Sequence, residues 1–191
     1  MADHRDVLDF WFGAADSPEF GRSRADWFRK SDAFDREIRT RFLDLQRDAA
    51  CGNLQAWRTA PDSLLALILL LDQFPRNLYR GTGEAFATDA QAQAAAQLAV
   101  DLGYDRSLVP VQRWFVYLPF EHAEDLALQR RCLELFDGLR ADPGSAETIN
   151  YARRHFEIIA RFGRFPHRNA ILGRASTPEE TEFLRQPGSS F

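Results

Sequence analysis

The chain has 191 residues, 45% of them hydrophobic, which is enough to bury one sizeable core, and we expect a single domain over residues 1–191. Its 24 basic and 28 acidic side chains give a formal net charge of −4, which disfavours nucleic-acid and membrane-surface binding because both need a basic field. No signal-peptide pattern opens the chain, and no apolar run approaches the roughly 20 residues that cross a bilayer, so we expect a cytoplasmic protein without a membrane partner.

The first clear helix follows Ser31, a good N-cap residue. Phe34, Ile38 and Phe42 recur at steps of three and four residues, and Gly52 stands where a left-handed C-terminal residue belongs. Sustained alternation typical of strands is found nowhere along the chain. This spacing predicts an amphipathic helix.

The next helix is expected to be the buried centre of the domain. Residues 64–71 are apolar on every side, and they follow Pro61 and Asp62 at a plausible helix start. We expect the helix to end at Phe74-Pro75, because proline lacks the backbone N–H and clashes with the preceding turn.

Five more helices are predicted along the rest of the chain. They cover residues 88–103, 110–119, 122–142 and 145–163, and a short one that starts at the capping-box pattern beginning with Thr177. The paired aromatic residues, among them Trp27-Phe28 and Trp114-Phe115, and the two cysteines, Cys51 and Cys132, are expected to be buried. The sequence thus predicts an all-α fold of about seven or eight helices.

Two stretches of the sequence resemble each other. Phe74-Pro75-Arg76-Asn77 precedes a helix start at Thr88, and Phe165-Pro166-His167-Arg168-Asn169 precedes one at Thr177. This similarity suggests two equivalent corners at which a helix breaks, a pattern typical of stacked antiparallel helical hairpins.

Four strings, "VLDFWFG", "LALILLLDQFPRNLYRGTGEAFATD", "RWFVYLPFEHAEDLALQ" and "RFGRFPHRNAILGR", are similar to those of a bacterial family known as domain of unknown function 924. The resemblance runs over nearly the whole chain. It implies an all-α, tetratricopeptide-repeat-like fold and no particular activity. The likeness to repeat proteins suggests binding in a concave groove, by analogy of fold alone.

The first polar group comprises Asp72, Arg76 and Asn77. A guanidinium suits a carboxylate or phosphate ligand, so Arg76 is a candidate contact. The structural alternative is that Arg76 and Asn77 bond backbone groups at a helix end, with Asp72 near Arg76 only if the helix continues past Pro75.

The second polar group lies in a segment that is basic although the whole chain is acidic. Its candidates are His155, Arg164, His167, Arg168 and Asn169. The positive charges of the arginines are expected to be balanced by an anionic ligand. The main alternative is an internal ion-pair network with the protein's own carboxylates. His155 fits a hydrogen-bonded core histidine better than a ligand contact.

The third polar group is Glu121, His122 and Asp125, which would share one face of a helix beginning near His122. Acidic residues in a first helical turn also favour the helix dipole, which is the simpler explanation. Neither HExxH nor paired-cysteine spacing supports a metal site, and no dinucleotide or P-loop motif supports a cofactor.

We therefore predict that both Phe-Pro corners point arginine and asparagine into one groove floored near Glu121, His122 and Asp125. The first interpretation is a binding protein for a small anionic molecule or a peptide carboxylate. The alternatives are a small-molecule hydrolase with His122 as general base beside a carboxylate such as Asp125, and an RNA-associated protein using residues 153–174. Whether the protein is an enzyme, and its oligomeric state, stay open.

Overall fold

The protein is all-helical throughout the part that the computed structural model describes, residues 2–190. The α-helices are α1 (His4–Phe12), α2 (Asp32–Ala50), α3 (Pro61–Leu78), α4 (Asp89–Asp101), α5 (Pro110–Glu121), α6 (Leu126–Asp137), α7 (Ala146–Phe162) and α8 (Pro178–Phe183). Six short 3-10 helices join them: η1 (Ala25–Trp27), η2 (Gln55–Thr59), η3 (Gly83–Phe86), η4 (Tyr104–Ser107), η5 (Pro143–Ser145) and η6 (Pro166–Arg168). The predicted all-α class with seven or eight helices is confirmed, whereas tetratricopeptide-repeat-like stacking stays a prediction.

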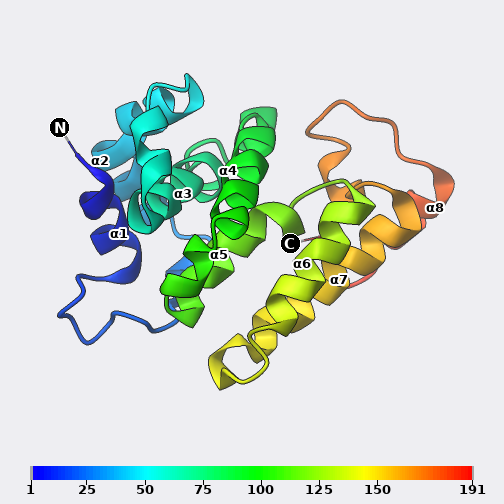
Figure 1. Cartoon of the computed structure of the whole chain (residues 1–191). Helices are drawn as coiled ribbons and strands as arrows, with labels where there is room; N and C mark the ends of the chain where they lie inside the picture. Colours follow the sequence, from blue (N-terminus) through cyan, green and yellow to red (C-terminus); the bar gives the residue numbers. More distant parts are fainter. Residues whose placement is uncertain (1, 191) are drawn as a thin grey trace.

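Helix α3 is the centre of the fold, as its apolar sequence predicts. Residues 64–71 are all buried, and α3 packs against α1, α2, α4 and α5. Figure 1 shows α1 to α4 on one side of the molecule and the α6–α7 pair on the other, with α5 between them. Each large side chain that α3 buries stabilises the fold by roughly 1.5–3 kcal/mol.

Helix α2 starts and ends as its sequence signals predict. Ser31 is the N-cap, and its hydroxyl accepts a hydrogen bond from the Phe34 backbone N–H at 3.3 Å. Gly52, just after the helix, has a φ of 78°, in the left-handed region that favours glycine.

Pro75 does not end α3, contrary to the prediction. The helix continues to Leu78, and Pro75 lies inside it. Proline cannot donate to the carbonyl of Leu71, one turn earlier, but the Thr88 hydroxyl donates to that carbonyl at 2.6 Å instead. A tertiary hydrogen bond thus replaces the bond that the proline removes.

Because α3 continues by one helical turn past Pro75, the polar residues Asp72 and Arg76 lie next to each other. Arg76 follows Asp72 by one helical turn, and the two form an ion pair of 3.2 Å. Phe165 and Pro166, by contrast, follow the end of α7 and lead into η6. The two Phe-Pro strings are therefore not equivalent corners, although Phe74 and Phe165 are both fully buried.

The boundary between α5 and α6 also differs from the prediction. Pro119 lies inside α5, which continues to Glu121, and α6 begins only at Leu126. Asp125 is the N-cap of α6, where its carboxylate accepts hydrogen bonds from Ala127 and Leu128. Glu121 and Asp125 therefore do not share a helical face, and the capping explanation holds for Asp125.

Two apolar side chains that were expected to be buried are exposed. Cys51 lies at the surface, while Cys132 is buried as predicted. Phe28 is 58% exposed, although its pair partner Trp27 and the Trp114-Phe115 pair are buried. Within residues 2–190 no helix is both long and apolar enough to cross a membrane.

Candidate functional site

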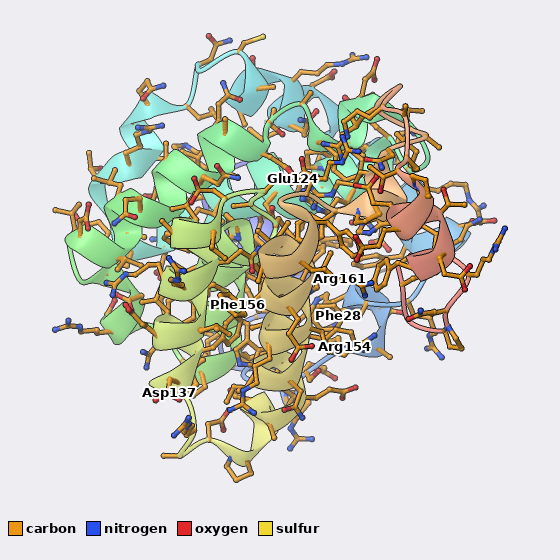
Figure 2. All side chains as sticks on the ribbon, turned by 90° about the vertical axis from the view of Figure 1, so that its right-hand side faces the viewer. Phe28, Glu124, Asp137, Arg154, Phe156 and Arg161 are labelled. Carbon is orange, nitrogen blue, oxygen red and sulfur yellow. The ribbon has the colours of Figure 1, made fainter. Side chains whose placement is uncertain are left out.

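The candidate site is a pocket of about 910 Å³ between the two halves of the chain. One wall comes from residues 23–30 and the C-terminal end of α3, and the other from α5, α7 and η6. Phe28 and Arg154, which both line the pocket, are labelled in Figure 2. The volume lies within the range of roughly 300–1,000 Å³ that small-molecule sites occupy.

The floor of this pocket is organised around a buried carboxylate. Asp72 has no solvent exposure, and its Oδ1 lies 2.7 Å from Nδ1 of His122 and 3.2 Å from Nη1 of Arg76. Gln73 donates from Nε2 to its other oxygen at 2.6 Å. Although burial opposes ionisation, Arg76 and then His122 hold the pKa of Asp72 well below its usual range.

His122 is neutral near pH 7 and open to the pocket. Burial, and then the charge of Arg76, lower its pKa, and Asp72 only partly opposes this. Because a carboxylate can only accept, His122 donates its Nδ1 proton to Asp72 and keeps a lone pair on Nε2. Nε2 makes no hydrogen bond within the described residues, and His122 lines the pocket.

Asp89 joins the two arginines that the sequence singled out. Its oxygens accept from Nη1 and Nη2 of Arg76 at 2.9 and 3.2 Å, and from Nη1 of Arg168 at 3.4 Å. The planar fork of Arg76 is therefore already occupied by a carboxylate of the protein. Asp72, Arg76, Asp89 and Arg168 form a balanced group of two acids and two bases.

Arg168 keeps one donor unpaired although it is buried. It is 6% exposed, and its guanidinium lies between the rings of Phe86 and Phe165, 4.6 Å from each centroid. Within residues 2–190 its Nε has no hydrogen-bond partner. Burial, and then the charge of Arg76, lower its pKa to about 10, which leaves it charged at neutral pH. A buried charged donor without a partner favours a ligand at this point.

Glu121 and His155 form a second buried pair beside His122. Oε1 of Glu121 lies 3.1 Å from Nδ1 of His155, and Glu121 Oε2 has no hydrogen-bond partner within the described part of the chain. Burial and then the charge of Asp72 raise the pKa of Glu121 to about 8, and burial lowers the pKa of His155 to about 3. Near pH 7 both groups are therefore neutral, and they do not form an ion pair. His155 donates to the Tyr151 carbonyl at 2.9 Å, which agrees with the prediction of a hydrogen-bonded core histidine.

The remaining predicted site residues have other surroundings. Asn77 and His167 line the pocket, and burial, followed by the charge of Arg168, lowers the pKa of His167 to about 4. Asn77 also donates to Asp35 at 2.8 Å. Arg164 forms an ion pair with Glu180. Asn169 donates to Ser176 and Glu180, so it stabilises the loop before α8, and Asp125 caps α6.

The internal ion-pair network accounts for most of the basic segment. Glu179, Glu180, Asp89 and Glu124 pair with the arginines at positions 161, 164, 168 and 174, in that order. At least four of the six arginines between residues 145 and 174 thus have a carboxylate partner among the described residues. This arrangement leaves little of the segment for an RNA backbone.

The pocket is nevertheless strongly basic at its mouth. Among the described residues, seven basic side chains line it against two acidic ones, Glu121 and Glu147. Three of the seven, Arg24, Arg29 and Lys30, come from the loop before α2, which the sequence analysis did not single out. Within residues 2–190 Arg29 has no ion-pair or hydrogen-bond partner. In the described part of the chain, Lys30 pairs only with Asp32, at 3.9 Å, where both side chains are at least 70% exposed. The excess positive charge thus lies at the mouth.

Comparison with other proteins identifies the family but not an activity. The solved structure of ATU0120, a protein of unknown function from Agrobacterium tumefaciens, has 43% sequence identity and a TM-score of 0.84, covering 95% of this chain and 96% of that chain. Among curated proteins, none matches the chain. The family model described as "Bacterial protein of unknown function (DUF924)" matches residues 7–188. The chain therefore belongs to the bacterial DUF924 family.

Proposed function

We propose that the protein binds a small anionic molecule in this pocket. The observation that carries the proposal is the charge of the described lining, seven basic side chains against two acidic ones, among which Arg29 has no carboxylate partner and Lys30 only an exposed one. At pH 7 the imbalance is larger, because burial and Asp72 raise the pKa of Glu121 to about 8 and keep it neutral. A concave, basic surface attracts anions and raises their local concentration.

Charge balance favours the mouth as the place for the anion. On the floor the two arginines already face Asp72 and Asp89, so a further negative charge there would lie close to two carboxylates. At the mouth Arg29 faces no carboxylate within the described residues, and Lys30 has a distant, solvated one. The anion therefore contacts Arg29 and Lys30, rather than the guanidinium groups of Arg76 and Arg168.

The floor then takes an uncharged polar group of the ligand. It offers the Arg168 Nε donor, the lone pair of His122 Nε2 and the protonated carboxyl of Glu121. A buried donor or acceptor without a partner costs about 1–3 kcal/mol, so a ligand that pairs with these groups recovers that free energy.

The experiment is isothermal titration calorimetry with benzoate, citrate and inorganic phosphate at low salt. Wild-type protein is expected to bind at least one of them, with an affinity that falls as salt screens the exposed cations. The double variant Arg29→Gln/Lys30→Gln should bind at least tenfold more weakly. The matched control Arg130→Gln/Arg131→Gln removes two neighbouring exposed charges outside the pocket and should bind like wild type. Equal binding by the two double variants contradicts the proposal.

A second candidate function is hydrolysis with His122 as general base, and the hydrogen bond between Asp72 and His122 favours it. The carboxylate that orients the imidazole is Asp72 rather than Asp125. A neutral imidazole held by a carboxylate takes a proton from a water molecule at Nε2 as the water attacks an acyl carbon. The test is hydrolysis of 1-naphthyl acetate. The wild type should exceed the buffer rate and His122→Gln should not, while equal rates for the two proteins contradict this candidate.

A further inference from the structure

The exposed apolar side chains gather at the pocket. Within residues 2–190 five large hydrophobic side chains are more than a third exposed, and three of them, Phe28, Tyr151 and Ile171, line it. A fourth, Leu172, lines the smaller neighbouring pocket of about 320 Å³, and Leu102 alone lies elsewhere among the described residues. Exposed apolar groups that cluster around a cavity mark a binding surface, whereas single scattered ones do not.

Phe28 is the most exposed of these side chains, yet other aromatic rings hold it in place. Its ring stacks on that of Phe115, with centroids 6.3 Å apart and an interplanar angle of 5°, and it meets Trp27 edge-on at 6.2 Å. Phe115 is fully buried and Trp27 is 7% exposed, so both belong to the core. A supported ring with more than half of its surface open is a rigid platform, which loses little conformational entropy when a ligand stacks on it.

Cations stand directly beside this platform. Arg29 and Lys30 follow Phe28 in the chain, and all three line the pocket. Across the mouth Tyr151 adds a second partly exposed ring, 40% accessible, and Trp114 extends the aromatic lining further along the wall. Flat apolar surface and uncompensated positive charge thus occur on the same short segment.

We infer that the ligand is an aromatic acid, a planar ring carrying one anionic group. The ring stacks on Phe28, and the anionic group lies between Arg29 and Lys30. Aromatic rings that are stacked face to face with an offset attract one another beyond the area they bury, by about 0.5–1.5 kcal/mol. The inference rests on the proposed function, because it assumes that an anion binds at this mouth, and it adds that the anion must be aromatic.

The pocket is larger than one ring, and its polar floor suits a substituted acid. A substituent with both a donor and an acceptor, such as an amide or hydroxyl group, is matched by the His122 lone pair and the Arg168 Nε–H. Both of these atoms belong to residues that line the same cavity as Phe28.

The test compares three probes by calorimetry on the full chain: 1-naphthoate, cyclohexanecarboxylate and 1-naphthalenemethanol. The first has an aromatic ring system and a charge, the second has the charge on a saturated ring, and the third has the aromatic ring system without a charge. We expect 1-naphthoate to bind at least tenfold more tightly than either of the others. Phe28→Ala should weaken 1-naphthoate at least tenfold while leaving cyclohexanecarboxylate unchanged, and Phe28→Tyr should retain binding.

Matched variants separate the two proposals. Leu102→Ala removes an apolar side chain outside the pocket that is 51% exposed, and it should bind 1-naphthoate like wild type. If both acids bind equally and Phe28→Ala changes neither, the aromatic inference is wrong while anion binding stands. If neither acid binds although citrate or phosphate does, the aromatic inference is likewise wrong, whereas if none of these anions binds, or the neutral alcohol binds as tightly as 1-naphthoate, anion binding itself is wrong. Circular dichroism of each variant before titration ensures that a loss of binding is not a loss of folding.

Discussion

Nδ1 of His122 lies 2.7 Å from Oδ1 of Asp72, a carboxylate with no solvent exposure. This hydrogen bond joins the C-terminal end of α5 to α3, the central helix. Arg76 shares the same carboxylate oxygen, so one buried charge fixes both a histidine and an arginine at the floor of the pocket.

Replacing Asp72 by asparagine should therefore destabilise the protein strongly. Asp72→Asn leaves the buried Arg76 with one carboxylate instead of two, and removing one partner of a buried ion pair costs about 3–5 kcal/mol. The measurement is the free energy of unfolding from urea denaturation at pH 7. Asp44→Asn, whose side chain is 95% exposed beside Arg47, should change it by less than about 0.5 kcal/mol. A similar loss of unfolding free energy in both variants contradicts the assignment of Asp72 as a buried ion-pair partner of Arg76.

The carboxylate of Asp72 should also make the free energy of unfolding fall as the pH falls. Despite burial, Arg76 and His122 lower the pKa of Asp72 in the folded protein, so the unfolded chain binds its proton more readily. The contribution of Asp72 is present above its ordinary pKa of about 3.9 and is lost as the pH falls below it. The free energy of unfolding of Asp72→Asn should thus fall less than that of wild type between pH 5 and pH 3.

Glu121 should have the opposite effect: at neutral and mildly alkaline pH it should make the free energy of unfolding fall as the pH rises. Because burial and Asp72 raise its folded pKa to about 8, the folded state holds a proton that the unfolded state releases. The contribution of Glu121 to the free energy of unfolding is therefore complete below its pKa in the unfolded chain. It falls as the pH rises toward 8, by up to about 1.4 kcal/mol per pH unit. His155, whose pKa burial lowers to about 3, opposes this only in acid, below its ordinary value of 6.5.

The effect of Glu121 on stability is thus best measured between pH 6.5 and pH 8, where His155 does not oppose it. Over that range Glu121→Gln should lose little stability in urea denaturation, whereas wild type loses about 1–2 kcal/mol. Parallel curves for the two proteins would show that Glu121 ionises as easily in the folded protein as in the unfolded chain.

The hydrogen bond that replaces the one lost at Pro75 is a further test of the fold. Thr88→Val keeps the side-chain shape but leaves the buried Leu71 carbonyl without its donor, which should cost about 1–3 kcal/mol. In a Pro75→Ala background the restored backbone N–H bonds to that carbonyl, so the same substitution should cost clearly less. An unchanged cost in both backgrounds refutes the compensation.

The sequence predicted well what depends on local pattern. Apolar periodicity placed the central helix at residues 64–71, and cap residues placed the start of α2 at Ser31 and of α8 at Thr177. These features depend on neighbouring residues alone, so a single sequence contains them.

The errors came from partners distant in the chain. Nothing near Pro75 indicates that Thr88 will bond the Leu71 carbonyl, and so the helix was ended too early. For the same reason Arg76 was expected on a turn, whereas it is helical and binds Asp89. Asp89 lies in the first turn of α4 and is not among the site residues that the sequence predicts. The pairing of Phe28 with Trp27 in the sequence predicts burial of both rings, but only Trp27 is buried.

The most direct measurement of the central claim is an NMR titration of the four tryptophan indole N–H signals with 1-naphthoate. Trp27 and Trp114 line the pocket, while Trp57 lies outside it and serves as an internal control. Anion binding at this mouth predicts saturable shifts of the Trp27 and Trp114 signals, no shift of Trp57, and loss of the effect in Arg29→Gln/Lys30→Gln. Saturable shifts centred on Trp57, or none at any tryptophan, would contradict the assignment of this pocket as the ligand site.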